Sequence, residues 1–556
     1  MKWPITVGLL AFITQRMSQL LVISLVLVSL NAVAQSKNSI QLKRPAAAQK
    51  TSCDDAADAL SRVRCKQTLR VGVRTGYPPF ASVDAGILRG FEIDLARQLA
   101  ESLGVTPSYV TVTPANRLAL LAEGHVDVVI ATMGHTLQRD REALFVRPHY
   151  YQSQTIVLGR KDLEVSGLLK LRGNTVCVTM GNSTNAELAI NGARLKLFDK
   201  ASQLVDELKL GGCSLVAQDN SFFAPYLQQS DFASLFETKF GFAPLPWGIA
   251  VARADGGRLA DVLGLSLRQF HMSGAFQALA KKYKVDSQFL DQQQGVWSGL
   301  NCSQITSLKD PVCVIAPRDN QLEPTSFAPR INDAEKFVQQ KTGVNIVLAM
   351  LKTGVGLQLL FEGMVFSIVL VLGAVLATWA IGWVFARGLA SQQPGLSWAT
   401  RFLLWPLQST PLILLMVLAG IVVSMTGVRS PYVALAAAVA ILGLYYGSSA
   451  GQTIAEAMAA LRQERALPVP SMSAAVYKAR VGFAAFMVNA ARGSPAASVM
   501  GVPELLSAMN DVASFSGERI TTYTFLLVFY ALLVVLVHRL VSAWQARLAL
   551  GGGAYA

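Results

Sequence analysis

The chain has 556 residues, of which 52% are apolar and 15% are charged, and its mean hydropathy is +0.39. This composition excludes a disordered chain, a collagen-like chain and a small disulfide scaffold. A formal net charge of +14 is compatible with nucleic acid or anionic lipid as a partner. The apolar residues are distributed unevenly along the chain, and their positions decide between these partners.

The first 34 residues have the layout of a secretory signal peptide. Lys2 and Arg16 precede an apolar run over residues 20–30, and small residues that suit cleavage follow it. An uncleaved anchor is the alternative, because a weaker apolar patch lies upstream of that run. Under either interpretation we expect the following segment to be exported, beginning with a tether at 35–67.

All six cysteines lie between the predicted signal peptide and residue 314, in the part of the chain that we expect to be exported. The more apolar part that follows contains none. The six cysteines are Cys53, Cys65, Cys177, Cys213, Cys302 and Cys313. An even number suits an oxidising compartment, and we expect sequential pairing, although other connectivities and buried free thiols are alternatives. No pair has the C-x-x-C spacing of a zinc site, so we expect no metal centre.

Residues 68–291 are predicted to form a soluble α/β domain. A short strand at 69–73 ends before a Pro-Pro pair, which cannot continue a sheet ladder. The spacing of apolar residues predicts a helix over 91–103 and a buried strand over 126–130. Such alternation indicates parallel sheets, whose ligands bind at the carboxyl ends of strands.

The motifs of this segment occur in a familiar order. They are Leu69-Arg-Val-Gly-Val, Tyr77-Pro-Pro-Phe, Gly90-Phe-Glu-Ile-Asp94, Gly124-His-Val-Asp127, Thr136-Leu-Gln-Arg139, Pro148-His-Tyr-Tyr151, Gly181-Asn-Ser-Thr184 and Asp219. The segment resembles the polar-amino-acid periplasmic binding proteins. The resemblance implies a bilobed fold that closes on one amino acid, with crossovers near 158 and 250. Lobe 1 would comprise about 68–158 and 250–291, and lobe 2 about 159–249.

The resemblance also implies which groups hold the amino acid. In the family an arginine that matches Arg139 binds the α-carboxylate, a role that suits its planar guanidinium. An acidic residue that matches Asp219 binds the α-ammonium group, and an aromatic ring at Tyr77 would stack on the ligand. The other implied contacts lie at Thr132, Gly134, Asn182, Ser183 and Thr184.

Arg74 bears on which amino acid is bound. It resembles the arginine of glutamate and aspartate binders, and residues 116–118 (Asn-Arg-Leu) resemble a stretch common among acidic-amino-acid binders. A second cation in the cleft would select a side-chain carboxylate and penalise lysine or arginine as ligands. We therefore expect an acidic ligand. If Arg74 points to solvent, the alternative is glutamine or another polar amino acid.

Residues 292–343 contain glutamines, prolines and mixed charge, which predict a connector. The part that follows, 344–556, contains apolar stretches long enough to cross a bilayer as helices. These stretches are 363–386, 402–428, 430–455 and 520–537, with a weaker candidate at 481–503. We therefore expect an all-α transmembrane domain of about five spans.

This second half resembles the permease subunit of polar-amino-acid ABC transporters. The matching motifs are Phe361-Glu-Gly-Met with Ser367, Ser409-Thr-Pro-Leu-Ile-Leu-Leu-Met416 and Ser498-Val-Met-Gly-Val-Pro-Glu-Leu-Leu506. We expect Thr410-Pro411 to break the second span, as is tolerated where a helix lines a substrate path. Cations mark the predicted cytoplasmic loops, at Arg387, Arg401, Arg462, Arg465, Lys478, Arg480, Arg539 and Arg547.

One motif departs from the permease pattern. Family members carry a Glu-Ala-Ala loop with a following glycine that inserts into the ATPase, whereas residues 461–479 contain two prolines and no clear match. A specialised ATPase, a second permease subunit that supplies the coupling helix, or loss of transport would each account for this difference.

The resemblances together imply an ABC amino acid importer subunit in a bacterial inner membrane, with its binding domain in the periplasm. Its partners would be an amino acid, the bilayer, a second permease subunit and a cytoplasmic ATPase that uses ATP, and no nucleic acid is needed to explain the charge. The sequence has no G-x-x-x-x-G-K-[ST] loop and no catalytic or metal motif. We therefore expect no enzyme activity and no cofactor in this chain.

A sensor or a ligand-gated, channel-like receptor without ATP-driven transport is the alternative function. Channels built on similar domains insert their pore between the two lobes. Here the sequence of the lobes runs to about Asp291 before any apolar span begins, which favours transport.

Overall fold

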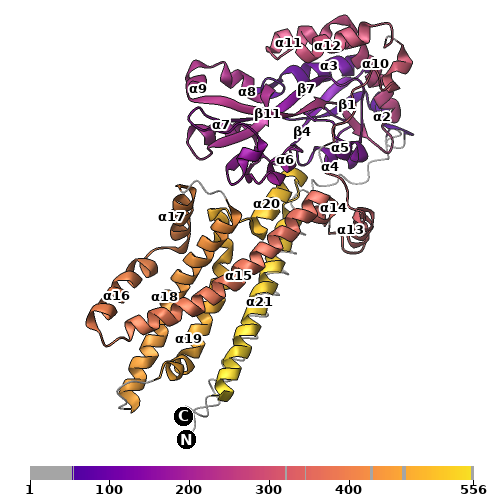
Figure 1. Cartoon of the computed structure of the whole chain (residues 1–556). Helices are drawn as coiled ribbons and strands as arrows, with labels where there is room; N and C mark the ends of the chain where they lie inside the picture. Colours follow the sequence, from indigo (N-terminus) through magenta and orange to yellow (C-terminus); the bar gives the residue numbers. More distant parts are fainter. Residues whose placement is uncertain are drawn as a thin grey trace.

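The structure is a computed structural model, and it describes residues 53, 56–302, 304–319, 322–344, 346–425, 430–465 and 471–551. The predicted signal peptide and the tether up to residue 52 lie outside these residues. An α/β part and a helical part follow one another along the chain (Figure 1).

The first lobe is built on a five-stranded sheet in the order β4-β1-β5-β12-β6. Its strands are β4 (Thr106–Thr111), β1 (Thr68–Val73), β5 (Val128–Val129), β12 (Ala250–Ala252) and β6 (Ala143–Phe145). β1 pairs in parallel with β4 and β5, whereas β12 is antiparallel to both of its neighbours. The lobe also contains α2 (Ala59–Lys66), α3 (Phe91–Leu103), α4 (Arg117–Ala122), α5 (Leu137–Glu142), α10 (Gly257–Ser273), α11 (Ala275–Tyr283) and the hairpin β2 (Ser82–Asp84)–β3 (Ile87–Arg89).

Helix α3 shows how the sequence specifies this lobe. Phe91, Leu95 and Leu99 recur at helical spacing and are fully buried. Gly104 follows the helix with a φ of +72°, and its N–H caps the last turn. Glycine adopts this left-handed conformation without steric cost, so the helix ends at the predicted residue.

The second lobe is built on a sheet in the order β11-β7-β10-β8-β9. Its strands are β11 (Phe236–Trp247), β7 (Tyr151–Arg160), β10 (Leu215–Asp219), β8 (Thr175–Thr179) and β9 (Arg194–Phe198). Its helices are η1 (Leu168–Leu171), α6 (Asn185–Ile190), α7 (Ala201–Lys209), α8 (Asn220–Leu227) and α9 (Ser230–Leu235).

The two crossovers between the lobes lie at the ends of β7 and β11. All of β7 pairs within the second sheet, so the first crossover precedes Tyr151 and is not near residue 158. The second crossover lies between Trp247 and Ala250, close to the predicted position. The difference arises because the long strand β7 continues straight from the hinge into the second lobe.

The connector is partly helical. It begins within α12 (Gln288–Ser298) and contains η2 (Ile305–Lys309) and α13 (Ala328–Thr342), and α14 (Ala349–Lys352) follows it. The sequential pairing of the cysteines is confirmed, with disulfides Cys53–Cys65, Cys177–Cys213 and Cys302–Cys313. The last of these lies within the connector and closes a short loop there.

The second half of the chain is helical. Its elements are α15 (Gly354–Leu389), α16 (Pro394–Ser409), α17 (Leu412–Met425), α18 (Pro431–Arg465), α19 (Met472–Gly493), η3 (Ser494–Met500), α20 (Leu505–Ser516) and α21 (Ile520–Gly551). Within the described residues, three helices are long and apolar enough to cross a membrane, namely α15, α18 and α21. The centre of the loop expected to contact an ATPase, residues 466–470, lies outside the described residues.

Helices α16 and α17 form a bent pair that would add a fourth span. They meet at 102°, and α16 ends and α17 begins on either side of Thr410-Pro411, where the break was expected. Helix α19 is not among the candidate spans, because it contains Lys478 and Arg480 and is less apolar. The described residues therefore contain three or four candidate spans instead of about five.

The two parts of the chain meet where α20 packs on lobe 2 (Figure 1). The Ser514 carbonyl oxygen accepts hydrogen bonds from the Gly181 N–H at 2.7 Å and from Asn185 Nδ2 at 3.0 Å. Arg519 forms an ion pair with Asp199 at 2.9 Å. The α/β part is therefore seated directly on the helical part.

Candidate functional site

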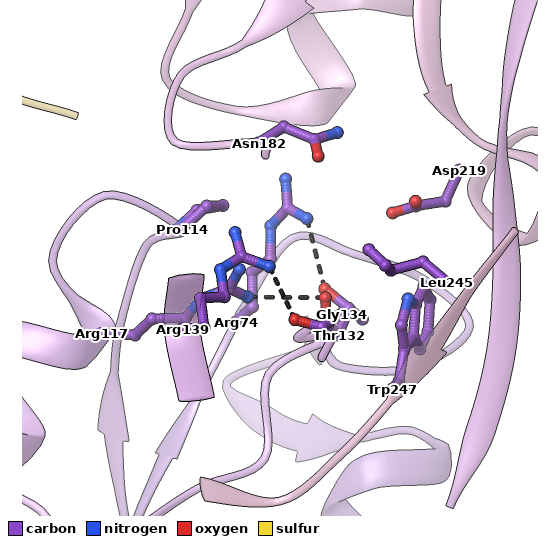
Figure 2. A pocket seen from close by; sticks show the side chains of 10 residues that line it. All are labelled: Arg74, Pro114, Arg117, Thr132, Gly134, Arg139, Asn182, Asp219, Leu245 and Trp247. Carbon is purple, nitrogen blue, oxygen red and sulfur yellow. Dashed lines mark hydrogen bonds between the residues drawn. The ribbon is translucent and has the colours of Figure 1, made fainter. Parts of the chain in front are cut away.

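A cavity lies between the two lobes, and ten residues line it (Figure 2). They are Arg74, Pro114, Arg117, Thr132, Gly134, Arg139, Asn182, Asp219, Leu245 and Trp247. The cavity has a volume of about 10 Å³, which is the space of a single water molecule. The lobes are therefore closed, and an amino acid enters only if they separate.

Six of the nine predicted ligand residues line this cavity, namely Arg74, Thr132, Gly134, Arg139, Asn182 and Asp219. Arg74 follows β1, and Thr132 and Gly134 follow β5. Across the cleft, Asn182 follows β8 and Asp219 ends β10. Parallel strands present their carboxyl ends at one edge of a sheet, which explains why residues far apart in sequence converge here.

Arg139 lies on α5 and connects the two lobes. Its Nη1 donates to the Gly134 carbonyl oxygen at 2.9 Å, and its Nη2 donates to the Gly181 carbonyl oxygen of lobe 2 at 3.1 Å. Burial lowers the pKa of Arg139 to about 10, so the guanidinium stays charged at neutral pH. Its planar fork points between the lobes, where a carboxylate would bind.

Arg74 does not point to solvent, because only 7% of the residue is exposed. Its Nη1 donates to Thr132 Oγ1 at 3.3 Å, and its guanidinium carbon lies 4.2 Å from the centre of the Tyr77 ring. Its Nη2 is buried and has no hydrogen-bond partner among the described residues. This nitrogen is therefore a free donor beside the cavity.

Arg117 is a third guanidinium in the cleft, and it was not among the predicted ligand residues. It is buried, its Nη1 donates to the Ala131 carbonyl oxygen at 2.6 Å, and its Nε has no partner among the described residues. Burial, and then the charges of Arg139 and Arg74, lower the pKa of this group. The resemblance at residues 116–118 was the one signal in the sequence that pointed to it.

Asp219 is the one carboxylate among the described residues that line the cavity. It accepts a hydrogen bond from the Tyr77 hydroxyl at 2.5 Å, and burial raises its pKa. A second acid, Glu92, lies behind the cavity, accepts from the Thr132 N–H at 2.6 Å and from the Tyr150 hydroxyl, and has a pKa raised by burial to about 7. The acids are thus fewer than the three arginines, and burial raises the pKa of both acids.

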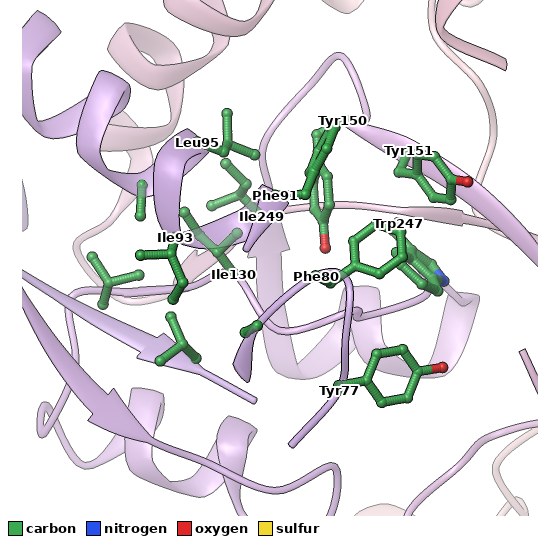
Figure 3. Close-up of a cluster of buried hydrophobic side chains, with 14 of the residues drawn as sticks. Tyr77, Phe80, Phe91, Ile93, Leu95, Ile130, Tyr150, Tyr151, Trp247 and Ile249 are labelled. Atoms are coloured by element: carbon green, nitrogen blue, oxygen red, sulfur yellow. The ribbon is translucent and has the colours of Figure 1, made fainter. Parts of the chain in front are cut away.

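Tyr77 is fully buried and does not line the cavity. Its ring packs under Arg74 and beside Trp247, in an aromatic cluster that Figure 3 shows together with Phe80 and Tyr151. In this closed structure the ring therefore supports Arg74, and its hydroxyl orients Asp219.

The turn at residues 182–184 contributes only Asn182 to the cavity wall. Asn182 Oδ1 accepts from the N–H and the hydroxyl of Thr184 at 3.3 and 3.1 Å, which fixes the turn. The Ser183 hydroxyl is buried without a partner among the described residues. Gly181 precedes the turn at a φ of +78°, and a Cβ there would lie 2.7 Å from the Ala115 N atom of lobe 1. A glycine is therefore required for the lobes to approach this closely.

Leu245 and Trp247 also line the cavity, although sequence reasoning did not select them. They lie at the end of β11, and this strand enters the hinge. Apolar residues at the end of a strand are typical of a core, so the sequence carried no signal that they face a ligand.

Two buried histidines, His135 and His149, do not line the cavity. His135 Nδ1 lies 2.9 Å from His149 Nε2, and His135 Nε2 lies 2.9 Å from Asp140 Oδ1. Burial lowers the pKa of His135 to about 4 and also lowers that of His149. Both rings are therefore neutral at physiological pH. The described part of the chain has no group of three His, Cys, Asp or Glu placed to hold a metal ion.

Comparisons with known proteins agree with this geometry. Residues 69–286 match the family of bacterial extracellular solute-binding proteins, family 3. The chain is 36% identical over 140 residues to the general L-amino acid-binding periplasmic protein AapJ of Rhizobium johnstonii, a match that covers 24% of this chain and 41% of that protein. It is 34% identical over 140 residues to the glutamate/glutamine/aspartate/asparagine-binding protein BztA of Rhodobacter capsulatus, with the same coverage of 24% and 41%.

Among solved structures, the chain is similar to a mutant of ArgBP from T. maritima. The identity is 27% and the TM-score 0.38, and the match covers 40% of this chain and 98% of that one. The matches to AapJ and BztA each span about two fifths of the length of those proteins. The family match and the curated relatives support a family 3 solute-binding domain at residues 69–286. The structure has a bilobed α/β fold there, followed by a helical part with three or four candidate spans among the described residues.

Proposed function

We propose that the cleft binds an acidic amino acid, glutamate or aspartate, and that the chain is the substrate-binding and membrane-spanning subunit of an ABC-type importer. The observation that carries the choice of ligand is the charge of the cleft. Arg74, Arg117 and Arg139 converge on one cavity, whereas Asp219 is the one carboxylate among the described residues that line it.

The atoms of an acidic amino acid match the groups of the cleft. The α-carboxylate would replace the carbonyl oxygens of Gly134 and Gly181 as the acceptor for Arg139, since a carboxylate forms the stronger, charge-assisted bond. Asp219 would accept from the α-ammonium group, as its position in lobe 2 allows.

The side-chain carboxylate would bind the two remaining arginines. Arg74 Nη2 and Arg117 Nε are donors without a partner among the described residues, and a buried donor without an acceptor costs free energy. The side-chain amide of glutamine has one acceptor oxygen instead of two, so it would accept from fewer of these donors, and it would not neutralise the charge of the arginines. A lysine or arginine ligand would add a cation to three others and is disfavoured.

The contact between the binding domain and the helical part of the same chain supports transport. The binding domain contacts α20 of the helical part through the carbonyl oxygen of Ser514. Since the sequence has no phosphate-binding loop of the Walker type, ATP would be hydrolysed by a separate cytoplasmic subunit. We infer a bacterial inner membrane location, a periplasmic binding domain and a second permease subunit as partner, and no enzyme activity or cofactor of this chain itself.

A sensor function without ATP-driven transport is the second candidate. The observation that favours it is the loop at 461–479, which lacks the motif that inserts into the ATPase. The two candidates share the ligand and differ in whether binding of the ligand is coupled to ATP hydrolysis.

A thermal-shift screen of the full chain in detergent against the proteinogenic amino acids tests the ligand. Glutamate or aspartate should raise the melting temperature, because a ligand that binds the folded state stabilises it. A response confined to lysine or arginine would reject the acidic ligand. Reconstitution with an ABC ATPase then separates the two functions. The importer requires ATP hydrolysis stimulated by the amino acid, and the sensor does not.

A further inference from the structure

The connector lies along lobe 1 at residues 315–318. The Arg147 guanidinium donates to the Ile315 carbonyl oxygen. The N–H of Arg318 donates to the His135 carbonyl oxygen at 3.0 Å, and its carbonyl oxygen accepts from the Leu137 N–H at 2.9 Å. The backbone of Arg318 is therefore fixed to lobe 1, where it forms a short parallel bridge with Thr136.

The side chain of the same residue reaches lobe 2. Arg318 Nη2 lies 3.0 and 3.3 Å from the two carboxylate oxygens of Glu187, and Nη1 lies 3.5 Å from the Pro244 carbonyl oxygen. The side chain of Glu187 is 9% exposed and that of Arg318 is 27% exposed. Solvent therefore screens this ion pair less than it screens a pair on the open surface.

The segments that Arg318 joins are those that carry ligand groups. On lobe 1, its backbone bonds to residues that lie between Gly134 and Arg139 in the sequence. On lobe 2, Glu187 belongs to α6, which begins directly after the turn at 182–184. Separation of the lobes would move Glu187 away from the backbone of Arg318, so the ion pair must break whenever the cleft opens.

We propose that Arg318 is a positioning residue for ligand binding that latches the two lobes closed through Glu187. The proposal rests on the proposed binding of an amino acid in the cleft. Because the closed cavity of about 10 Å³ cannot admit an amino acid, both entry and release require the latch to open. The connector thus sets how long the ligand stays bound, in addition to joining the two parts of the chain.

The test compares Arg318→Gln with the parent as full chains in detergent. The variant should release bound glutamate about tenfold faster in a chase experiment, the expected effect of losing one charge-assisted contact. A second readout needs no ligand. Spin labels on Glu123→Cys in lobe 1 and Leu210→Cys in lobe 2, both exposed in the structure, should report a larger separation of the lobes in the variant.

A charge exchange assigns the effect to the ion pair. Arg318→Glu and Glu187→Arg should each widen the separation and speed release, and the double variant should restore both values. Arg330→Gln, at an exposed arginine of α13, is the matched control and should behave as the parent.

Two outcomes would overturn the latch. In the first, Arg318→Gln leaves the separation of the lobes and the release rate unchanged. In the second, the double variant is as open as the single ones. If the parent chain binds no amino acid, the proposed function is wrong. The distance between the spin labels, measured without ligand in the parent and in Arg318→Gln, then tests the latch independently.

Discussion

Arg139 has backbone carbonyl oxygens as its acceptors in the closed cleft, one from each lobe. Such acceptors are neutral, so a carboxylate that entered the cleft would form a stronger, charge-assisted bond with the guanidinium. The guanidinium can hold both oxygens of a carboxylate at once, and an ammonium group cannot reproduce this geometry.

Arg139→Lys therefore keeps the charge and removes the fork. We expect it to weaken the binding of every amino acid by roughly 100-fold, since hydrogen bonds to charged groups contribute about 1.5–3 kcal/mol each. Isothermal titration with the full chain measures this effect. Arg141→Lys, at an exposed residue of the same helix, serves as the control, and equal affinities of the two variants would contradict the assigned role.

Glu92 makes the stability of the binding domain depend on pH. Burial raises its pKa from 4.5 to about 7, so the folded protein holds this proton more tightly than the unfolded chain does. Below about pH 4.5 the Glu92 carboxyl is protonated in both the folded and the unfolded state, so its burial does not make the free energy of unfolding depend on pH. As pH rises from about 4.5 to 7, only the unfolded state ionises, so stability falls.

Glu92→Gln should remove this contribution, because an amide does not titrate and its oxygen still accepts from Thr132 and Tyr150. The melting temperature of the parent should fall more steeply between about pH 4.5 and 7 than that of the variant. Parallel curves for the two proteins would show that Glu92 does not carry the effect.

The elements differ in how far the sequence predicts them. Helix α3 was predicted with its bounds, because both its apolar spacing and its terminal glycine are local signals. The first crossover is predicted too far along the chain. The sequence of the long strand β7 carries no local signal that marks where lobe 1 ends and lobe 2 begins. Trp247 faces the cavity because of how strands and helices meet in three dimensions, and no local pattern records that. For Arg117 the one signal was the resemblance at residues 116–118.

Helix α20 is the element that joins the two parts of the chain. Gly517 ends it with a φ of +77°, and a Cβ there would lie 2.9 Å from the Ala115 Cβ of lobe 1. Its neighbour Ser514 bonds to Gly181 of lobe 2. The end of α20 therefore touches both lobes beside the cleft.

Gly517→Ala should loosen this contact and raise hydrogen exchange in the segment around Gly181, as mass spectrometry would detect. Gly343→Ala is a matched control, because its φ of +70° imposes the same backbone strain while nothing lies within 4 Å of the added Cβ. If both variants leave exchange at 181–185 unchanged, the contact with α20 does not stabilise the lobe.

The composition of the chain follows from its two unlike parts. A soluble binding domain and an apolar helical part average to the intermediate hydropathy of the chain, and they meet in one structure through α20 and the connector. The order of the two parts followed from the sequence. Their contact did not, because it depends on backbone atoms of residues far apart in the chain, such as Gly181 and Ser514.

We infer that the charge of the cleft selects an acidic amino acid. The most direct test of this selection is competition against radiolabelled glutamate on the full chain and on Arg74→Gln. We expect the parent to bind glutamate at least about tenfold more tightly than glutamine, arginine not to compete, and Arg74→Gln to lose the preference over glutamine. Displacement of glutamate by arginine at equal or lower concentration than by unlabelled glutamate would contradict this selection.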